Sequence, residues 1–171
     1  MRRTIVLLLI VAALIIPAED NLSSFLKRIE QLNSFYNTFD PSTLKISILD
    51  AINLSKEKDV IAVYLDLVNN SPMWVVLTTK NRITIDPITG KIFSSQQFTY
   101  RATPYTVSLK DAISLAFVSI GKGIFFAYLD DQNTWIVGSK EQIASVSTKT
   151  PAVLSTQKRE QKPGSPGGGN R

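Results

Sequence analysis

The sequence predicts an α+β protein made of two similar units, each a helix packed on an antiparallel sheet, with an additional amphipathic helix before them. The main observation is an internal repeat, because residues 46–55 and 107–116, which lie 61 residues apart, have Ser, Asp, Ala, Ile and Leu at the same offsets. The correspondence continues beyond these segments: Tyr64-Leu65-Asp66 matches Tyr128-Leu129-Asp130, and Trp74-Val75-Val76 matches Trp135-Ile136-Val137. A repeat of this length indicates one supersecondary unit used twice, whose copies bury apolar surface together.

The first residues have the pattern of a targeting segment. Arg2 and Arg3 form a positive start, residues 4–16 are almost wholly apolar, and Pro17-Ala18 precedes an acidic pair. A membrane-spanning helix needs about 20 apolar residues, so we expect residues 1–18 to be a signal peptide that is cleaved near Ala18. The alternatives are an uncleaved signal anchor and a twin-arginine signal. In each case we expect the folded part outside the cytoplasm, either secreted or at the cell surface.

An amphipathic helix is expected within residues 20–40. Apolar side chains recur there at three- and four-residue spacing from Leu22 to Tyr36, with charged and polar residues between them. Asp40-Pro41 should end the helix, because proline lacks a backbone donor and disfavours helical geometry in the residue before it.

The first repeat is expected over residues 45–95. Ser47 and Asp50 have the spacing of a capping box, which predicts the start of a helix over about residues 48–57. Apolar residues alternate over residues 61–67, which predicts a strand with one dry face. Turn residues then separate three further strands, expected at 73–79, at 82–86 and from residue 92.

The second repeat is expected over residues 106–154, after a linker at 96–106. Its helix should run over 109–120, and its first hairpin should comprise strands at 124–130 and 134–139. The ending has drifted, because the chain after residue 146 has no counterpart to Asp86 and Gly90, and the last hairpin is left undetermined. Residues 157–171 have no apolar side chains and are rich in Gly and Pro at their end, which predicts a disordered tail.

The ending of the first repeat carries a family resemblance. The helix contains Ser-x-x-Asp-Ala-Ile, an aromatic residue begins the second strand, and the last hairpin reads Ile83-Thr84-Ile85-Asp86-Pro87-Ile88-Thr89-Gly90-Lys91-Ile92. Together these features closely resemble the PepSY domain family, in which a short helix packs on an antiparallel sheet. The second repeat resembles it only through its helix and first hairpin, as a degenerate copy. The resemblance implies a protein that restrains proteases and has no catalytic residues of its own.

The residue types that the chain lacks exclude several classes of function. It has no histidine and no cysteine, which excludes Ser-His-Asp triads, imidazole and thiolate ligands and disulfides. Residues 19–156 carry 13 basic and 13 acidic side chains, so the positive charge lies at the chain ends and predicts no nucleic-acid partner. We therefore expect no cofactor and no metal ion.

Two motifs have both a chemical and a structural interpretation. The chain contains five Ser-x-x-Lys pairs, the spacing of a Ser-Lys hydrolase, but a chain rich in both residues produces such pairs by chance and the accompanying motifs are missing. Asp130-Asp131-Gln132-Asn133 has clustered oxygens suited to calcium, but it lacks the glycine and distal glutamate of a known calcium loop and suits a hairpin turn.

Four aromatic residues are the candidates for partner binding: Tyr64, Trp74, Tyr128 and Trp135. Each tryptophan opens the second strand of its repeat, where it either packs in the helix-covered core or stands on the open face of the sheet. If exposed, the four side chains would form an aromatic surface for a protein partner, since aromatic residues dominate interface hot spots.

These observations predict an exported, non-catalytic binding module whose partner is a protein. The first hypothesis is that it restrains or chaperones an extracytoplasmic protease. The second is a structural or sensory extracellular module, attached to the membrane only if the N-terminal segment is retained. A Ser-Lys hydrolase is the third.

Overall fold

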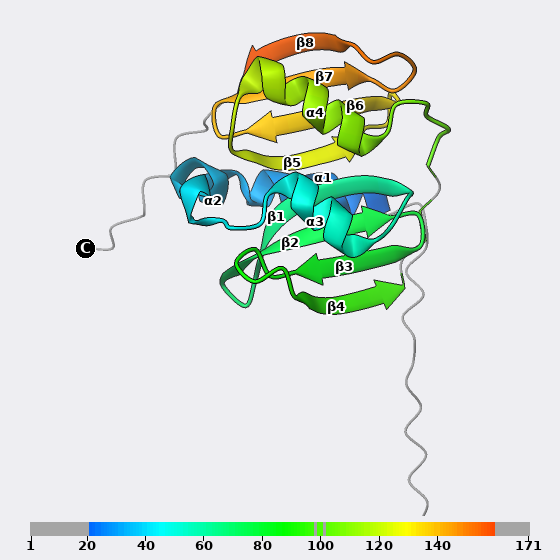
Figure 1. Ribbon diagram of the computed structural model, residues 1–171. Coiled ribbons are helices and arrows are strands. Elements are labelled where there is room, and N and C mark those ends of the chain that lie inside the picture. The colour runs from blue at the N-terminus through cyan, green and yellow to red at the C-terminus, as the bar shows by residue number, and fades with distance from the viewer. Residues whose placement is uncertain (1–20, 98, 101, 160–171) are drawn as a thin grey trace, which may run out of the picture.

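The computed structural model describes residues 21–97, 99–100 and 102–159, and its strands form one antiparallel sheet (Figure 1). The sheet has eight strands in the order β4-β3-β2-β1-β5-β6-β7-β8. The strands are β1 (Val60–Val68), β2 (Ser71–Thr78), β3 (Asn81–Ile85), β4 (Ile92–Gln97), β5 (Ile124–Leu129), β6 (Thr134–Ser139), β7 (Gln142–Ser147) and β8 (Val153–Lys158). The α-helices are α1 (Asn21–Gln31), α2 (Asn33–Thr38), α3 (Ile48–Ser55) and α4 (Leu109–Ile120), and a 3-10 helix, η2, spans Pro41–Thr43.

The predicted fold class, an α+β protein made of two units that each pack a helix on an antiparallel sheet, is wrong, and whether the two sheets are continuous was not predicted. β1 of the first repeat pairs antiparallel with β5 of the second, so the two halves share a single sheet-dominated architecture. The physical reason lies in the backbone of these two strands. In a separate half, each would be an edge strand with a row of unpaired N–H and C=O groups, and pairing the two strands satisfies these groups.

The contact between β1 and β5 has approximate two-fold symmetry. It consists of three residue pairs: Ala62–Tyr128, Val63–Ala127 and Tyr64–Phe126. Tyr64 and Tyr128 correspond in the repeat, at a spacing of 64 residues. When each residue is replaced by its counterpart 64 positions away, the pair Ala62–Tyr128 becomes Tyr64–Phe126, and the pair Val63–Ala127 stays the same. The two-fold axis that relates the repeats therefore passes beside Val63 and Ala127.

One face of the sheet is covered by α3 and α4, one helix from each repeat (Figure 1). Both helices begin where the sequence predicts, because Ser47 Oγ accepts the N–H of Asp50 at 3.2 Å and Ser108 Oγ accepts that of Asp111 at 3.1 Å. Each repeat also fastens the segment before its helix through a tryptophan. The indole N–H groups of Trp74 and Trp135 donate to the carbonyl oxygens of Ile46 and Val107, both at 2.8 Å.

The opposite face of the sheet is covered at its centre by α1, which lies behind the strands in Figure 1. The predicted N-terminal helix is therefore present, although it is divided at Leu32 into α1 and α2. The ring of Phe25 in α1 lies 5.1 Å from that of Tyr64 and 5.2 Å from that of Tyr128, both edge-on. A single side chain thus packs against the two corresponding tyrosines, at the two-fold axis.

The last hairpin of the second repeat is formed by β7 and β8, and it extends beyond residue 154. The start of the predicted disordered tail is therefore misplaced, because residues 157 and 158 belong to β8 and Arg159 is buried. The guanidinium of Arg159 lies 5.2 Å from the ring centroid of Tyr36 and donates to the side chain of Asn33, which orders this segment. The rest of the predicted tail and the predicted signal peptide lie outside the described residues. Within the described part of the chain, no helix combines the length and apolar character that crossing a membrane requires.

Gly138 is the position where packing against β5 leaves no room for a side chain. A Cβ atom there would lie 2.0 to 2.5 Å from three ring carbons of Phe126, the residue opposite it in β5. We expect Gly138→Ala to lower the free energy of unfolding by about 1–3 kcal/mol, because the ring must move out of a packed site. Urea denaturation measures this effect. In a Phe126→Ala background the same change should cost much less, and equal costs in both backgrounds would contradict the steric explanation.

The turn that carries the family resemblance is stabilised by a carboxylate. Asp86 accepts the backbone N–H groups of Ile88 at 2.8 Å and Thr89 at 2.9 Å, and these hydrogen bonds lower the pKa of its carboxyl group. The pKa of an aspartate in the unfolded state is about 3.9. A carboxyl group whose pKa is lower in the folded state stabilises the fold at pH values above the unfolded pKa, and this contribution is lost as the pH falls through the folded pKa.

Asp86→Ala should therefore be less stable than the parent at pH 7, and the difference should shrink as the pH falls from about 5 to 2. Thermal unfolding across this range measures it. Ile88→Ala keeps the carboxylate and both N–H donors, so it should keep the acid sensitivity of the parent. A difference between Asp86→Ala and the parent that does not change with pH would contradict this assignment.

Candidate functional site

The four aromatic residues predicted to bind a partner lie on two different faces of the sheet. Trp74 and Trp135 are 0 % exposed under α3 and α4, so their interpretation as core residues is confirmed. Tyr64 is buried and Tyr128 partly exposed on the opposite face, where both contact Phe25. The structure therefore brings the tyrosines together but separates them from the tryptophans. The predicted aromatic surface required exposed tryptophans, and this condition is not met.

The observed contacts concern both chemical alternatives, the Ser-Lys hydrolase and the calcium site at Asp130. In none of the five Ser-x-x-Lys pairs does the ammonium group form a hydrogen bond with the serine hydroxyl, among the contacts of the described residues. Asp130 Oδ1 accepts the N–H groups of Gln132 at 3.0 Å and Thr134 at 2.7 Å, as expected for a hairpin turn. Burial, with smaller contributions from Asp130 and Asp131, raises the pKa of Tyr128 to about 12, so its phenol stays protonated near neutral pH.

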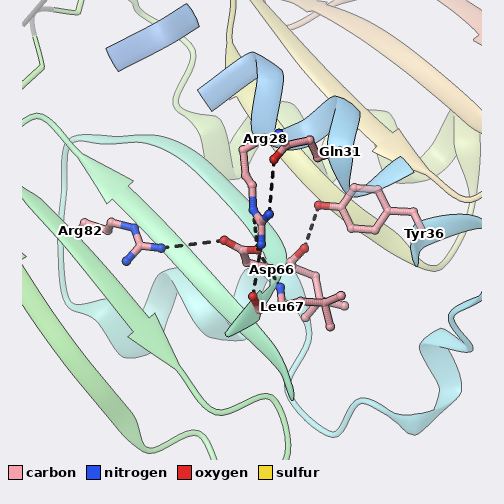
Figure 2. A network of polar contacts seen from close by, with 7 residues as sticks. Arg28, Gln31, Tyr36, Asp66, Leu67 and Arg82 are labelled. Carbon is pink, nitrogen blue, oxygen red and sulfur yellow. Dashed lines mark hydrogen bonds and ion pairs between the residues drawn. The ribbon is translucent and has the colours of Figure 1, made fainter. Parts of the chain in front are cut away.

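The densest polar network joins α1 to β1 (Figure 2). Asp66 is only 4 % exposed, and its Oδ1 accepts from Arg28 Nε at 3.0 Å and Nη2 at 2.6 Å. Arg82 Nη2 lies 3.8 Å from the other carboxylate oxygen, and Leu67 N–H donates to Oδ1 at 2.7 Å. The hydrogen bond to Asp66 raises the pKa of Arg28. Oδ1 of the carboxylate thus accepts three hydrogen bonds, and the network holds the helix against the sheet.

The two ends of the sheet present apolar side chains to solvent. β4 and β8 pair on their outer sides with no other described strand. Phe93 in β4 is 64 % exposed and Leu154 in β8 is 61 % exposed. Both residues lie at register shifts, where the edge strand has one residue more than its neighbour. We call Phe93 and Leu154 the edge residues.

The edge residues are equivalent, and the sequence contains a signal for this that the repeat analysis missed. Residues 92–96 read Ile-Phe-Ser-Ser-Gln and residues 153–157 read Val-Leu-Ser-Thr-Gln, with the same spacing of 61 residues as the helices. The segment was not recognised because the turn before it differs between the repeats. β4 has no charged residue, and β8 has only Lys158, although natural edge strands are commonly protected by charges.

An apolar cavity of about 450 Å³ lies between α3, α4 and the loop that follows α2. Its apolar walls come from residues of both repeats, and two lysines belong to its lining. We call it the helix groove, and its lining includes Pro41, Leu44, Lys45, Ile48, Leu49, Trp74, Ile113, Phe117, Lys122 and Ile124. The edges and the helix groove are separate surfaces, because they share none of these residues. Among the described residues, no group of three or more Asp or Glu side chains is arranged to hold a metal ion.

Comparisons with known proteins place the chain in no family. No family model matches it, and no curated protein matches it. A crystal structure described as a "putative lipoprotein" from Clostridium difficile 630 is similar at 17% sequence identity and a TM-score of 0.37. The match covers 72% of this chain and 97% of that chain.

The polar network generates a stability prediction. Arg28→Ala should lower the free energy of unfolding by about 2 kcal/mol, because the buried carboxylate of Asp66 loses both of its side-chain hydrogen-bond donors and keeps only the Leu67 N–H. Urea denaturation measures the loss, and hydrogen exchange should show faster opening of α1. Gln31→Ala removes only the exposed 3.4 Å contact to Arg28 and should change stability by less than about 0.5 kcal/mol. Equal effects of the two variants would contradict the role given to Asp66.

Proposed function

We propose that this chain is an exported, non-catalytic protein that binds extended segments of another protein at the edges of its sheet. The partner class that we propose is an extracytoplasmic protease, which the chain restrains or chaperones. The location follows from the targeting pattern of residues 1–18, and the partner class from the resemblance of the first repeat to PepSY domains.

The observation that carries the proposal is the pair of edge strands, each of which exposes an apolar side chain to solvent. An edge strand with free N–H and C=O groups is a template for an additional strand, and pockets or apolar side chains beside it select the segment that binds. Here both edges carry an apolar side chain that is more than three-fifths exposed, β4 has no charged residue, and the single charge in β8 is that of Lys158 at its last residue. The duplication preserves this arrangement in both repeats.

The backbone of β8 shows which groups a partner strand would use. The N–H of Arg159 donates to the carbonyl of Glu141 at 2.8 Å. Donors alternate between the two sides of an antiparallel strand, so the N–H groups of Thr156 and Lys158 point away from β7. A proline at residue 156 therefore removes an outward donor and keeps the pairing with β7, as proline is tolerated at such edge positions.

The experiment is an inhibition assay with the secreted, mature chain and the thermolysin-like proteases of the same organism. We expect the parent to slow hydrolysis of a small peptide substrate. The double variant Phe93→Ser/Leu154→Ser should weaken inhibition at least about tenfold, which corresponds to about 1.4 kcal/mol of binding free energy. Thr156→Pro should weaken it as well.

Val118→Ser is the matched control, because Val118 is an apolar residue that is 87 % exposed on α4 and belongs to neither edge strand. It should inhibit like the parent. Absence of inhibition by the folded parent would contradict the proposed partner class. Inhibition that is unchanged in both edge variants would contradict the proposed binding surface.

A further inference from the structure

The helix groove is built as a small-molecule site. Its volume of about 450 Å³ lies within the range of roughly 300–1,000 Å³ that is typical of such sites. Its walls are mainly aliphatic and aromatic, and Phe117 remains 46 % exposed at its side. An apolar ligand in this cavity would cover the exposed side chain of Phe117. Binding would be favourable because apolar surface of both the ligand and the protein is removed from water.

The charged residues that line the groove are all basic. Lys45 and Lys122 both belong to the lining and are exposed, and no acidic residue lines the groove. Neither ammonium group makes an ion pair or hydrogen bond with another described residue. Asp40 precedes the lining residue Pro41, but its carboxylate accepts the N–H of Ser42 at 2.9 Å. Two unpaired cations beside an apolar cavity complement an occupant with an anionic end.

Two polar groups in the lining of the groove are already engaged within the protein. The indole N–H of Trp74 donates to Ile46, and the hydroxyl of Ser47 donates to the Asp50 carboxylate at 2.6 Å. A peptide segment carries an amide at every residue, and each amide buried without a partner would cost free energy. A hydrocarbon chain has no such requirement, so the walls favour it over a peptide.

From these three observations we propose that the helix groove binds a long-chain fatty acid. The acyl chain lies against Ile48, Ile113 and Phe117, and the carboxylate lies between the ammonium groups of Lys45 and Lys122. This site is independent of the protein partner proposed for the edges, and it adds a lipid ligand to a protein that we expect outside the cytoplasm.

The test is a titration of the full mature chain, after removal of carried-over lipid, with a fluorescent long-chain fatty acid below its micellar concentration. We expect saturable binding of one ligand per chain. Lys45→Gln/Lys122→Gln should weaken binding of the acid at least about tenfold, because it removes two charge-assisted contacts. Binding of the corresponding methyl ester should be weak in the parent and unchanged by the lysine variant.

Phe117→Ser should weaken binding of both the acid and the ester, because it removes part of the apolar wall. Three variants outside the groove should bind like the parent: Val118→Ser beside Phe117, Lys140→Gln, and the edge variant Phe93→Ser/Leu154→Ser. Normal thermal unfolding of each variant shows that it is folded. The absence of saturable binding would overturn the proposal. So would binding that is insensitive to both the lysine and Phe117 variants, or displacement of the fatty acid by an acidic peptide at lower concentration.

Discussion

The antiparallel contact between β1 and β5 is the constraint on which the rest of the structure depends. It joins the repeats through only three residue pairs, a short seam for a sheet of eight strands. The seam is reinforced on both faces. Phe25 packs on Tyr64 and Tyr128 on one face, and the Tyr36 hydroxyl donates to the carbonyl of Leu65 at 2.8 Å, just beyond the paired residues. α3 and α4 cover the other face, and each also contacts a central strand of the opposite repeat.

A single helix at a two-fold axis must break the symmetry of the repeats, and the corresponding residues Asp66 and Asp130 show how. Asp66 lies under α1 and binds Arg28, which fixes the helix to the first repeat. Among the described side chains, no residue of α1 pairs with Asp130, which instead accepts two backbone N–H groups in its own hairpin. The same residue type was therefore retained at equivalent positions for different structural reasons. The difference between Asp66 and Asp130 therefore reflects α1, which has no counterpart in the second repeat.

Local features of the fold could be predicted from the sequence, and contacts between distant segments could not. The Ser47 and Ser108 caps and the alternation in β1 depend on neighbouring residues, so periodicity and capping patterns identify them. Periodicity shows which face of a strand is apolar, but it does not show which strand will lie beside it. The joining of β1 to β5 was therefore left open by the sequence, and the covering of Tyr64 by Phe25 was missed, together with the burial that decides where a binding surface can be. The resemblance to PepSY domains stays a prediction.

The geometry of the sheet limits how the two edges can act. Neighbouring strands lie about 4.8 Å apart, so β4 and β8, separated by seven spacings, are roughly 34 Å apart. One short extended segment therefore cannot occupy both edges. The centre of the sheet is unavailable to a partner, because α1 covers one face and α3 and α4 cover the other. A duplicated edge thus provides two equivalent sites at opposite ends of one rigid sheet. A partner with two suitable segments would gain affinity from binding both, since the second contact forms at a high effective concentration.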